Sequence, residues 1–339
     1  MPDAPVVLSA IVLAVVPSLL YLLVLNLIDR YEKEPWTLLL ACLGVGAVAA
    51  TAIVLIVFTA LGRPTRLPPA FAPGLRPDAL TGIVEELVLG VLLIALVRYA
   101  RDEFDDILDG VIYGAAVGAG FGAAESFLYA MGGTQLLSRG TVVTLVVAGL
   151  DHACYMAVLG AILGWASRLP GMHRWIATGL GLATAAWLHA LHDTLPAIFA
   201  RILERPDAAV GFATRLLAEA VDWLGLLTIA VVVVAAWRRE ARILRHELRP
   251  EVDAGVVSAD DFATITSFRR QLSRQVRLFR ADGLGEVVRL RRRYAVEGEL
   301  AFHKWRLVVR RGTTPAAEHL DELRAEIRRL AETTREGAA

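Results

Sequence analysis

The chain has 339 residues, 56% of them hydrophobic, and its mean hydropathy is +0.53. Soluble domains are about 45–50% apolar, so this composition argues against a purely soluble protein. The formal net charge is zero, but the segment from Arg238 onward is basic, with 22 Lys and Arg against 16 Asp and Glu. We therefore expect a membrane-embedded part followed by a basic tail.

Seven apolar runs approach the length that a membrane-spanning helix needs, which is about 20 residues. They cover residues 6–28, 37–61, 80–97, 107–130, 140–163, 175–200 and 217–237. The sequence thus predicts an all-α fold: a polytopic transmembrane helical bundle of about seven spans with a small helical C-terminal cytoplasmic region. The predicted domains are 1–237, the transmembrane part, and 238–339, the tail. Cys42 and Cys154 lie within apolar runs, so we expect them to be core residues without a disulfide.

The distribution of arginines predicts the orientation, because Lys and Arg in short loops favour the cytoplasmic side. The last span is followed by four arginines between Arg238 and Arg245, so the tail is expected in the cytoplasm. Seven spans then place the N-terminus outside the cell membrane. The loop that carries three arginines between Arg63 and Arg76 would also lie outside and is an exception to the rule.

The tail is expected to form two or three amphipathic helices, in a small bundle or a coiled pair. Ser258, with Asp261 three residues later, resembles a capping box in which Asp replaces Glu. Apolar residues recur at helical spacing from Phe262 to Phe279 and from Leu320 to Leu330. The arginines at 291–293 are more typical of a solvated face than of a lipid contact. We expect no nucleic-acid partner.

The fourth apolar run combines a glycine pattern with a glutamate. Gly110, Gly114, Gly118 and Gly122 recur every fourth residue, so they share one helix face that a neighbouring backbone can approach closely. Glu125 lies on the same face and should point into the bundle. An ionised carboxylate near the bilayer centre costs about 2.5–3.5 kcal/mol, which favours a role in chemistry or transport. A structural glutamate bonded to a neighbouring helix is the alternative.

Glu85 and Glu86 lie at the head of the third apolar run. Adjacent residues on a helix point about 100° apart, so the two carboxylates cannot face one ligand symmetrically. We expect a division of roles, with one as general base and the other orienting a metal or water. The alternative is a polar helix start in the headgroup region.

Two histidines, His152 and His189, lie within the fifth and sixth runs, and Asp193 shares a helix face with His189. A carboxylate at this spacing can fix the imidazole tautomer or bind a metal itself. One buried histidine is usually a satisfied core residue, but two of them with three intramembrane glutamates favour a shared site. At about 1.5 Å of rise per residue, the three glutamates, His189 and Asp193 span less than one leaflet, and His152 lies near the midplane. We therefore expect these groups to meet in a water-accessible cavity in the outer half of the membrane.

The double glutamate and the segment 109–129 resemble the PrsW family of intramembrane proteases, which is distantly related to the type II CAAX prenyl endopeptidases. The family pattern begins with a double glutamate followed by a lysine, EExxK, and continues with FxxxE. Glu85 and Glu86 match the first motif, and Phe121 to Glu125 match the second. The glycine-rich stretch that ends in FxxxE is the most specific part of the resemblance.

The histidine segments of the family have counterparts here, whereas the motif lysine does not. His189 to Asp193 fit HxxxD, and His152 fits a further histidine segment. Leu89 occupies the lysine position, so the role of that cation is vacant or belongs to another basic residue such as Arg98. The resemblance covers roughly residues 20–235 and leaves out the tail.

The resemblance implies an intramembrane metallo-endopeptidase that cuts a membrane-anchored protein, such as an anti-sigma factor. The expected catalytic residues are Glu85, Glu86, Glu125 and His189. The expected ligands of a divalent metal, with Zn²⁺ as the best fit, are Glu125, His152, His189 and Asp193. A metal-free glutamate mechanism is the alternative, and the HExxH motif of another zinc-protease class is absent from the sequence.

Two functions of other classes also fit parts of the sequence. Buried acids serve proton-coupled transporters and channels, although no inverted repeat of broken helices is visible here. A catalytically inactive membrane scaffold whose tail binds a partner is consistent with Leu89 at the lysine position.

Overall fold

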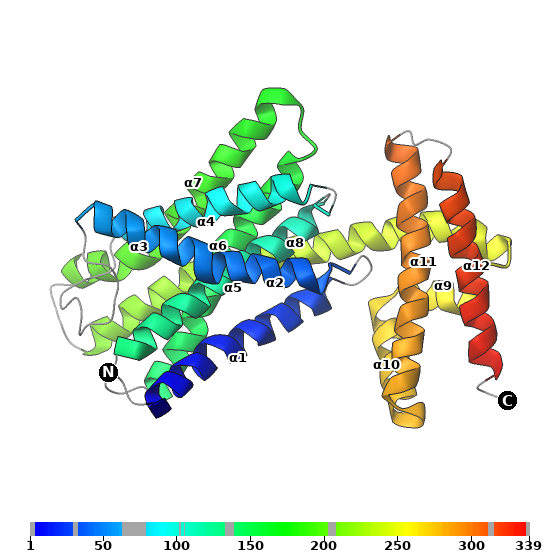
Figure 1. Cartoon of the computed structure of the whole chain (residues 1–339), viewed down its shortest axis with the longest axis horizontal. Coiled ribbons are helices and arrows are strands. Elements are labelled where there is room, and N and C mark those ends of the chain that lie inside the picture. The colour runs from blue at the N-terminus through cyan, green and yellow to red at the C-terminus, as the bar shows by residue number, and fades with distance from the viewer. Residues whose placement is uncertain are drawn as a thin grey trace. The chain divides into compact units, whose positions relative to one another are not determined.

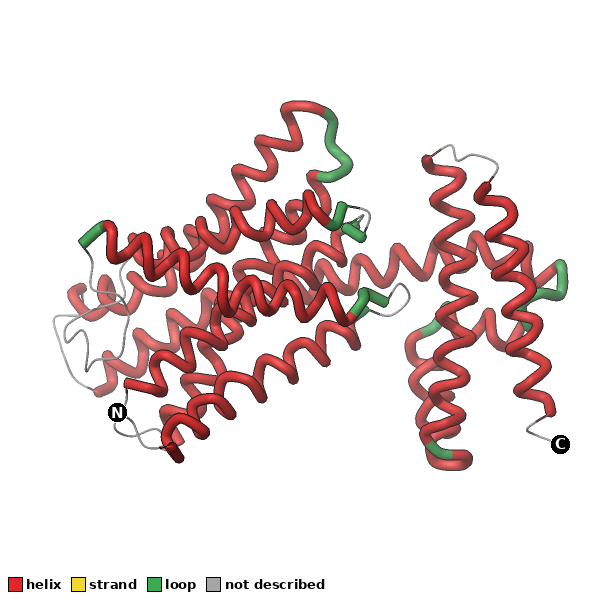
Figure 2. Tube along the Cα trace, in the orientation of Figure 1, coloured by secondary structure: helices red, strands yellow, loops and turns green. Residues whose placement is uncertain are grey.

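The computed structural model describes residues 4–29, 33–62, 79–101, 103–104, 106–132, 139–202, 208–310 and 315–336. All regular structure in these residues is helical (Figure 2), so the predicted all-α fold is confirmed. The helices belong to two compact units, residues 1–29 with 34–233 and residues 30–33 with 234–339 (Figure 1). A domain boundary at 237 stays a prediction.

The first unit contains the most apolar helices. They are α1 (Ala4–Ile28), α2 (Trp36–Gly44), the π-helical segment η1 (Val45–Ala50), α3 (Thr51–Ala60), α4 (Ala79–Tyr99), α5 (Ile107–Gly132), α6 (Arg139–Ala166), α7 (Gly171–Ile202) and the first part of α8 (Ala208–Asp253). Because α2, η1 and α3 follow one another directly, they form one long helix with a π-helical turn inside it.

Among the described residues, four helices are long and apolar enough to cross a membrane. They are Ala4–Ile28, Trp36–Ala60, Ala79–Tyr99 and Ile107–Met131. These helices confirm a multi-helix membrane protein. The last three expected spans fall within α6, α7 and α8, so a total of seven crossings stays a prediction. The arginine-bearing loop lies in residues 63–78, outside the described residues.

The buried helix α5 packs against the α6 backbone through the predicted glycine face. A Cβ atom on Gly110 would lie 2.0 Å from a backbone oxygen of α6, and one on Gly114 or Gly118 would lie 2.1 Å from another. No real Cβ contact is this short, so only glycine permits this separation of the two helices. The glycine face therefore fixes the position of α6 beside α5.

Another side of α5 packs equally closely against the long second helix. A Cβ on Gly120 would lie 2.0 Å from the Leu43 oxygen, and one on Gly46 would lie 1.9 Å from the Val117 oxygen. Gly46 belongs to η1, so the π-helical turn lies where this helix meets α5. The sequence predicts an uninterrupted α-helix here. π-helical turns are rare and often occur at functional sites.

The second unit contains the rest of α8 and four further helices, one or two more than predicted. They are α9 (Ala259–Ile265), α10 (Phe268–Asp282), α11 (Leu284–Arg310) and α12 (Pro315–Glu336). Ser258 accepts a hydrogen bond from the Asp261 amide at the start of α9, as the capping pattern predicts. The apolar run expected from Phe262 to Phe279 is interrupted at Ser267, whose extended backbone separates α9 from α10.

A separate apolar core holds the second unit together. It joins residues of α8, α9, α11 and α12, among them Leu244, Leu248, Ile265, Leu300 and Ile327. The predicted apolar positions of α12 take part in this core. Cys42 and Cys154, both in the first unit, are buried and free, as expected.

Candidate active site

One carboxylate oxygen lies within hydrogen-bond distance of both histidines of the candidate site. Glu86 Oε1, on α4, lies 2.7 Å from His152 Nδ1 on α6 and 3.1 Å from His189 Nδ1 on α7. An ionised carboxylate only accepts hydrogen bonds, so each ring donates its Nδ1–H to Glu86. In the neutral tautomer that this contact favours, the Nε2 atom of each ring would carry the lone pair that a metal binds.

Three more carboxylates surround the Nε2 atoms of these rings. Glu125 Oε2, on α5, lies 3.2 Å from His152 Nε2. Glu85 Oε2 lies 3.8 Å from His189 Nε2, and Asp193 Oδ2 lies 3.7 Å from the same atom. The structure thus brings together all six site residues predicted from the sequence, whereas the individual role of each stays a prediction.

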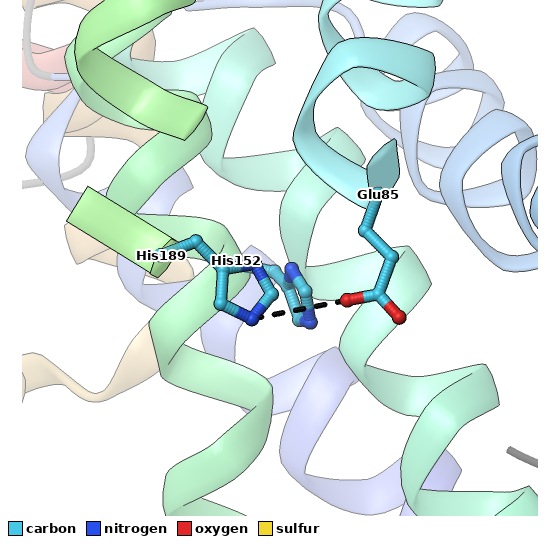
Figure 3. A group of neighbouring side chains, drawn as sticks. All are labelled: Glu85, His152 and His189. Atoms are coloured by element: carbon cyan, nitrogen blue, oxygen red, sulfur yellow. Dashed lines mark ion pairs between the residues drawn. The ribbon is translucent and has the colours of Figure 1, made fainter. Parts of the chain in front are cut away.

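Three of these residues offer ligand atoms that lie close enough to share a metal ion. Glu85, His152 and His189 each supply one such atom, and all three atoms lie within 4.8 Å of one another. Figure 3 shows Glu85 pointing from its helix toward the two imidazoles. All three residues are buried. The ligands expected from the sequence include both Glu125 and Asp193 but not Glu85.

Glycines allow the histidines to reach this position. A Cβ on Gly82 would lie 2.8 Å from the His189 ring, so a larger residue one turn before Glu86 would displace that ring. A Cβ on Gly118 would lie 2.1 Å from the His152 backbone oxygen. The α5 glycine pattern therefore has a direct consequence for the site, because it lets the His152 backbone approach α5 closely.

Two aromatic side chains pack against the histidine rings. Phe121, the first residue of FxxxE, lies edge-on to His152 with ring centroids 4.7 Å apart. Tyr155 stacks on His189 with centroids 5.3 Å apart and is buried. Sequence reasoning missed both Tyr155 and Gly82. Tyr155 had a usable signal, because it follows His152 by three residues and lies on the same helix face.

The position of the family's lysine is apolar in this chain. Leu89 is fully buried and lies on α4, one turn after Glu85. Arg98 does not replace the missing cation. Its guanidinium lies over the Trp175 ring, 4.6 Å from the centroid. Arg98 also follows Glu86 by about three helical turns, roughly 18 Å along α4.

The donor set of this cluster suits a divalent metal. Imidazole and carboxylate together are typical ligands of catalytic zinc. Glu86 is fully buried, and among the described residues its Oε2 atom has no hydrogen-bond partner. Such an atom is costly unless something polar or charged meets it. A bundle of apolar helices with carboxylates and histidines gathered inside it fits a membrane-embedded enzyme.

Comparison with known proteins identifies the family. The sequence model described as "PrsW family intramembrane metalloprotease" matches residues 34–237, and the chain therefore belongs to this family. The protein named Protease PrsW from Geobacillus kaustophilus (strain HTA426) is 26% identical over 226 residues, which cover 60% of this chain and 94% of that protein. Protease PrsW from Bacillus subtilis (strain 168) is 28% identical over 151 residues, which cover 44% of this chain and 64% of that protein. No solved structure matches the chain.

Proposed function

We propose that this chain hydrolyses a peptide bond of a membrane-anchored protein, at the cluster formed by α4, α5, α6 and α7. The observation that carries this proposal is the contact of one buried Glu86 oxygen with His152 and His189 at 2.7 and 3.1 Å. Such a contact orients two imidazoles toward the same space. Family membership supports a protease over a transporter or an inactive scaffold.

We propose that Glu85, His152 and His189 hold a divalent metal, most suitably Zn²⁺. Their mutual distances and their ligand chemistry both support this choice. When bound, the metal would activate water and polarise the scissile carbonyl. Glu86 would keep both rings in one tautomer, as the carboxylates behind metal-bound histidines commonly do.

Proton transfer requires a carboxylate that water and substrate can reach. Glu125 fits this need best, because 14% of its side chain is exposed against 2% for Glu85 and none for Glu86. Its Oε2 atom lies 3.2 Å from His152 Nε2, next to the proposed metal position. We propose that Glu125 takes a proton from the attacking water and delivers it to the leaving amine. From the sequence, Glu85 or Glu86 is expected to activate the water, and Glu125 is expected among the metal ligands.

The test measures cleavage and metal content in the same samples. Wild type, Glu85→Gln and Glu125→Gln are purified in detergent and incubated with a panel of single-span membrane proteins, and bound metal is quantified by mass spectrometry. We expect Glu125→Gln to retain metal and lose cleavage, and Glu85→Gln to lose both. The reverse pattern supports the roles assigned from the sequence. Active wild type that holds no metal and resists chelators contradicts the metal mechanism.

The proposed substrate is a membrane-anchored signalling protein. The family resemblance supports a membrane-anchored signalling regulator, such as an anti-sigma factor, as the protein that is cut. The arginines that follow Trp237 support a cytoplasmic tail and an outer N-terminus. A panel of single-span regulators, each assayed with wild type and with Glu86→Ala as the inactive control, tests this part.

A further inference from the structure

Helix α10 presents an unusual apolar stripe. Four large apolar residues recur at helical spacing and are 40–56% exposed: Phe268, Leu272, Val276 and Phe279. A neighbouring flank of α10 packs inward, through Leu278. A stripe of this size on a tail helix needs a covering partner.

The polar side of α10 carries five arginines and no acid before Asp282. Arg274 pairs with Asp260 and Asp261 at 2.8 and 3.1 Å, inside the unit. The other four are exposed, and no described carboxylate lies within ion-pair distance of them. These four are Arg269, Arg270, Arg277 and Arg280. A helix whose apolar stripe is bordered by arginines without an ion pair matches an anionic surface that also accepts apolar side chains.

The start of α10 lies beside the end of the apolar part of α8. Phe268 stacks on Trp237, with ring centroids 5.8 Å apart. Trp237 is the last residue of an apolar stretch and is followed directly by Arg238 and Arg239. Tryptophan next to arginines at the end of a span is typical of the membrane–water interface. With residues 217–237 as the expected last span, this contact would bring the first turn of α10 to the depth of the lipid headgroups.

The direction of α10 is consistent with this placement. Figure 1 shows α10 running across, rather than along, the part of α8 that belongs to the same unit. A helix that begins at the interface and crosses the direction of a span runs along the membrane surface. Its 15 residues cover about 22 Å of that surface.

We propose that α10 is an in-plane membrane anchor that inserts Phe268, Leu272, Val276 and Phe279 into the adjacent leaflet, with anionic phospholipid headgroups bound by its arginines. The anchor is separate from the proteolytic site and does not depend on it. Phosphate groups pair well with exposed arginines, and each basic residue near an anionic surface strengthens binding measurably. The tail is thereby held against the membrane from which α8 emerges.

The test uses the full chain in nanodiscs with a lipid-sensitive fluorophore on one cysteine. Cys42 and Cys154 are first replaced by alanine. The probe is then attached at Leu272→Cys, on the stripe, or at Ser273→Cys, which lines a hollow on the other side of α10. We expect quenchers on the lipid acyl chains to quench the probe at 272 but not at 273. Adding phosphatidylglycerol to phosphatidylcholine nanodiscs should increase this quenching.

Variants of the arginines and of the apolar stripe separate the two contributions to membrane docking. With the probe at 272, Arg269→Gln/Arg280→Gln should lower the docking equilibrium constant roughly 30-fold in phosphatidylglycerol nanodiscs. Phe279→Ser should lower it in both lipid compositions. Arg328→Gln, an exposed arginine of α12, is the matched control and should have little effect.

Three outcomes overturn the proposal. A probe at 272 that only aqueous quenchers reach shows a solvated stripe. A probe shielded from water but not quenched by lipid, with energy transfer between labelled copies, shows a second copy of the chain. Equal quenching at 272 and 273 shows that no face of α10 is selected by the membrane.

Discussion

His152 Nδ1 lies 2.7 Å from Glu86 Oε1, although the two residues are 66 positions apart in the chain. The contact joins α6 to α4 through a fully buried oxygen. Because Glu86 accepts a hydrogen bond from His189 as well, the orientation of both rings depends on a single carboxylate. In the proposed mechanism, Glu86 is therefore a positioning residue, and the residues around the histidine Nε2 atoms are the ones that would contact metal and substrate.

Glu86→Gln and His189→Ala are each expected to abolish cleavage while the protein stays folded. Glutamine keeps the shape of Glu86 but weakens the hydrogen bonds that orient both rings, so metal affinity should fall by about 10–100-fold. Cleavage and bound metal are measured together with thermal stability in detergent. Full activity in either purified variant would refute the site.

Gly118→Ala should destabilise the first unit and reduce activity. The added Cβ would lie 2.1 Å from the His152 backbone oxygen, so α6 must move away from α5 and carry the histidine with it. Overpacking of this kind costs about 1–3 kcal/mol. Gly179→Ala on α7 is the matched control, because a Cβ there meets nothing within 4 Å. If both variants have wild-type thermal midpoints and activity, the close approach is unimportant.

The tail is expected to be dispensable for peptide-bond cleavage. Every site residue lies between Glu85 and Asp193, and the tail core begins at Ile243. A chain that ends after Arg242 avoids leaving that core half-exposed. We expect it to cleave substrate in detergent at a rate close to that of the full chain. A well-folded truncation without activity would show that the tail contributes to catalysis.

The sequence predicted where the helices lie and which polar residues come close together. It did not predict the hydrogen bonds among those residues. Spans such as Ala4–Ile28 follow from continuous apolar runs, and the helix start at Ser258 follows from local capping chemistry. The π-helical turn around Gly46 did not follow, because it arises where the helix meets α5. The contact of Glu86 with both histidines could not be predicted either. It depends on how α4, α6 and α7 are oriented relative to one another, which tertiary packing decides.

Glu297, on α11 in the tail, should make tail stability depend on pH. Burial, reinforced by the nearby Asp261 carboxylate, raises the pKa of Glu297 from 4.5 to about 8. Between these values the folded tail keeps a proton that the unfolded chain releases. Stability therefore falls as pH rises through this window, and the loss is complete above pH 8.

Glu297→Gln should remove this pH dependence, because an amide has no proton to lose. Arg293 Nε, which donates to Glu297 Oε1 at 3.2 Å, keeps an acceptor in the variant. Hydrogen exchange of α11 peptides is compared between variant and wild type at equal pH. At pH 9 we expect exchange at least about tenfold slower in the variant, and at pH 5 a small difference. Equal exchange at both pH values would mean that Glu297 titrates normally.

The site should be reached from the outer face of the membrane. The arginines after Trp237 favour a cytoplasmic tail, and seven crossings would then put the start of α4 and the end of α5 on the opposite side. Leu80→Cys and Tyr129→Cys lie near these two helix ends at exposed positions. In a background without Cys42 and Cys154, both should react with an impermeant thiol reagent added to intact cells.

Arg249→Cys, exposed near the end of α8, is the opposite control and should react only after permeabilisation. A reversed pattern, with Arg249→Cys labelled from outside and the two site-proximal cysteines protected, would invert the orientation. Water would then enter the site from the cytoplasm, since lipid supplies none. The substrates would in that case present their cleaved bond near the inner leaflet, as for the CAAX-processing relatives.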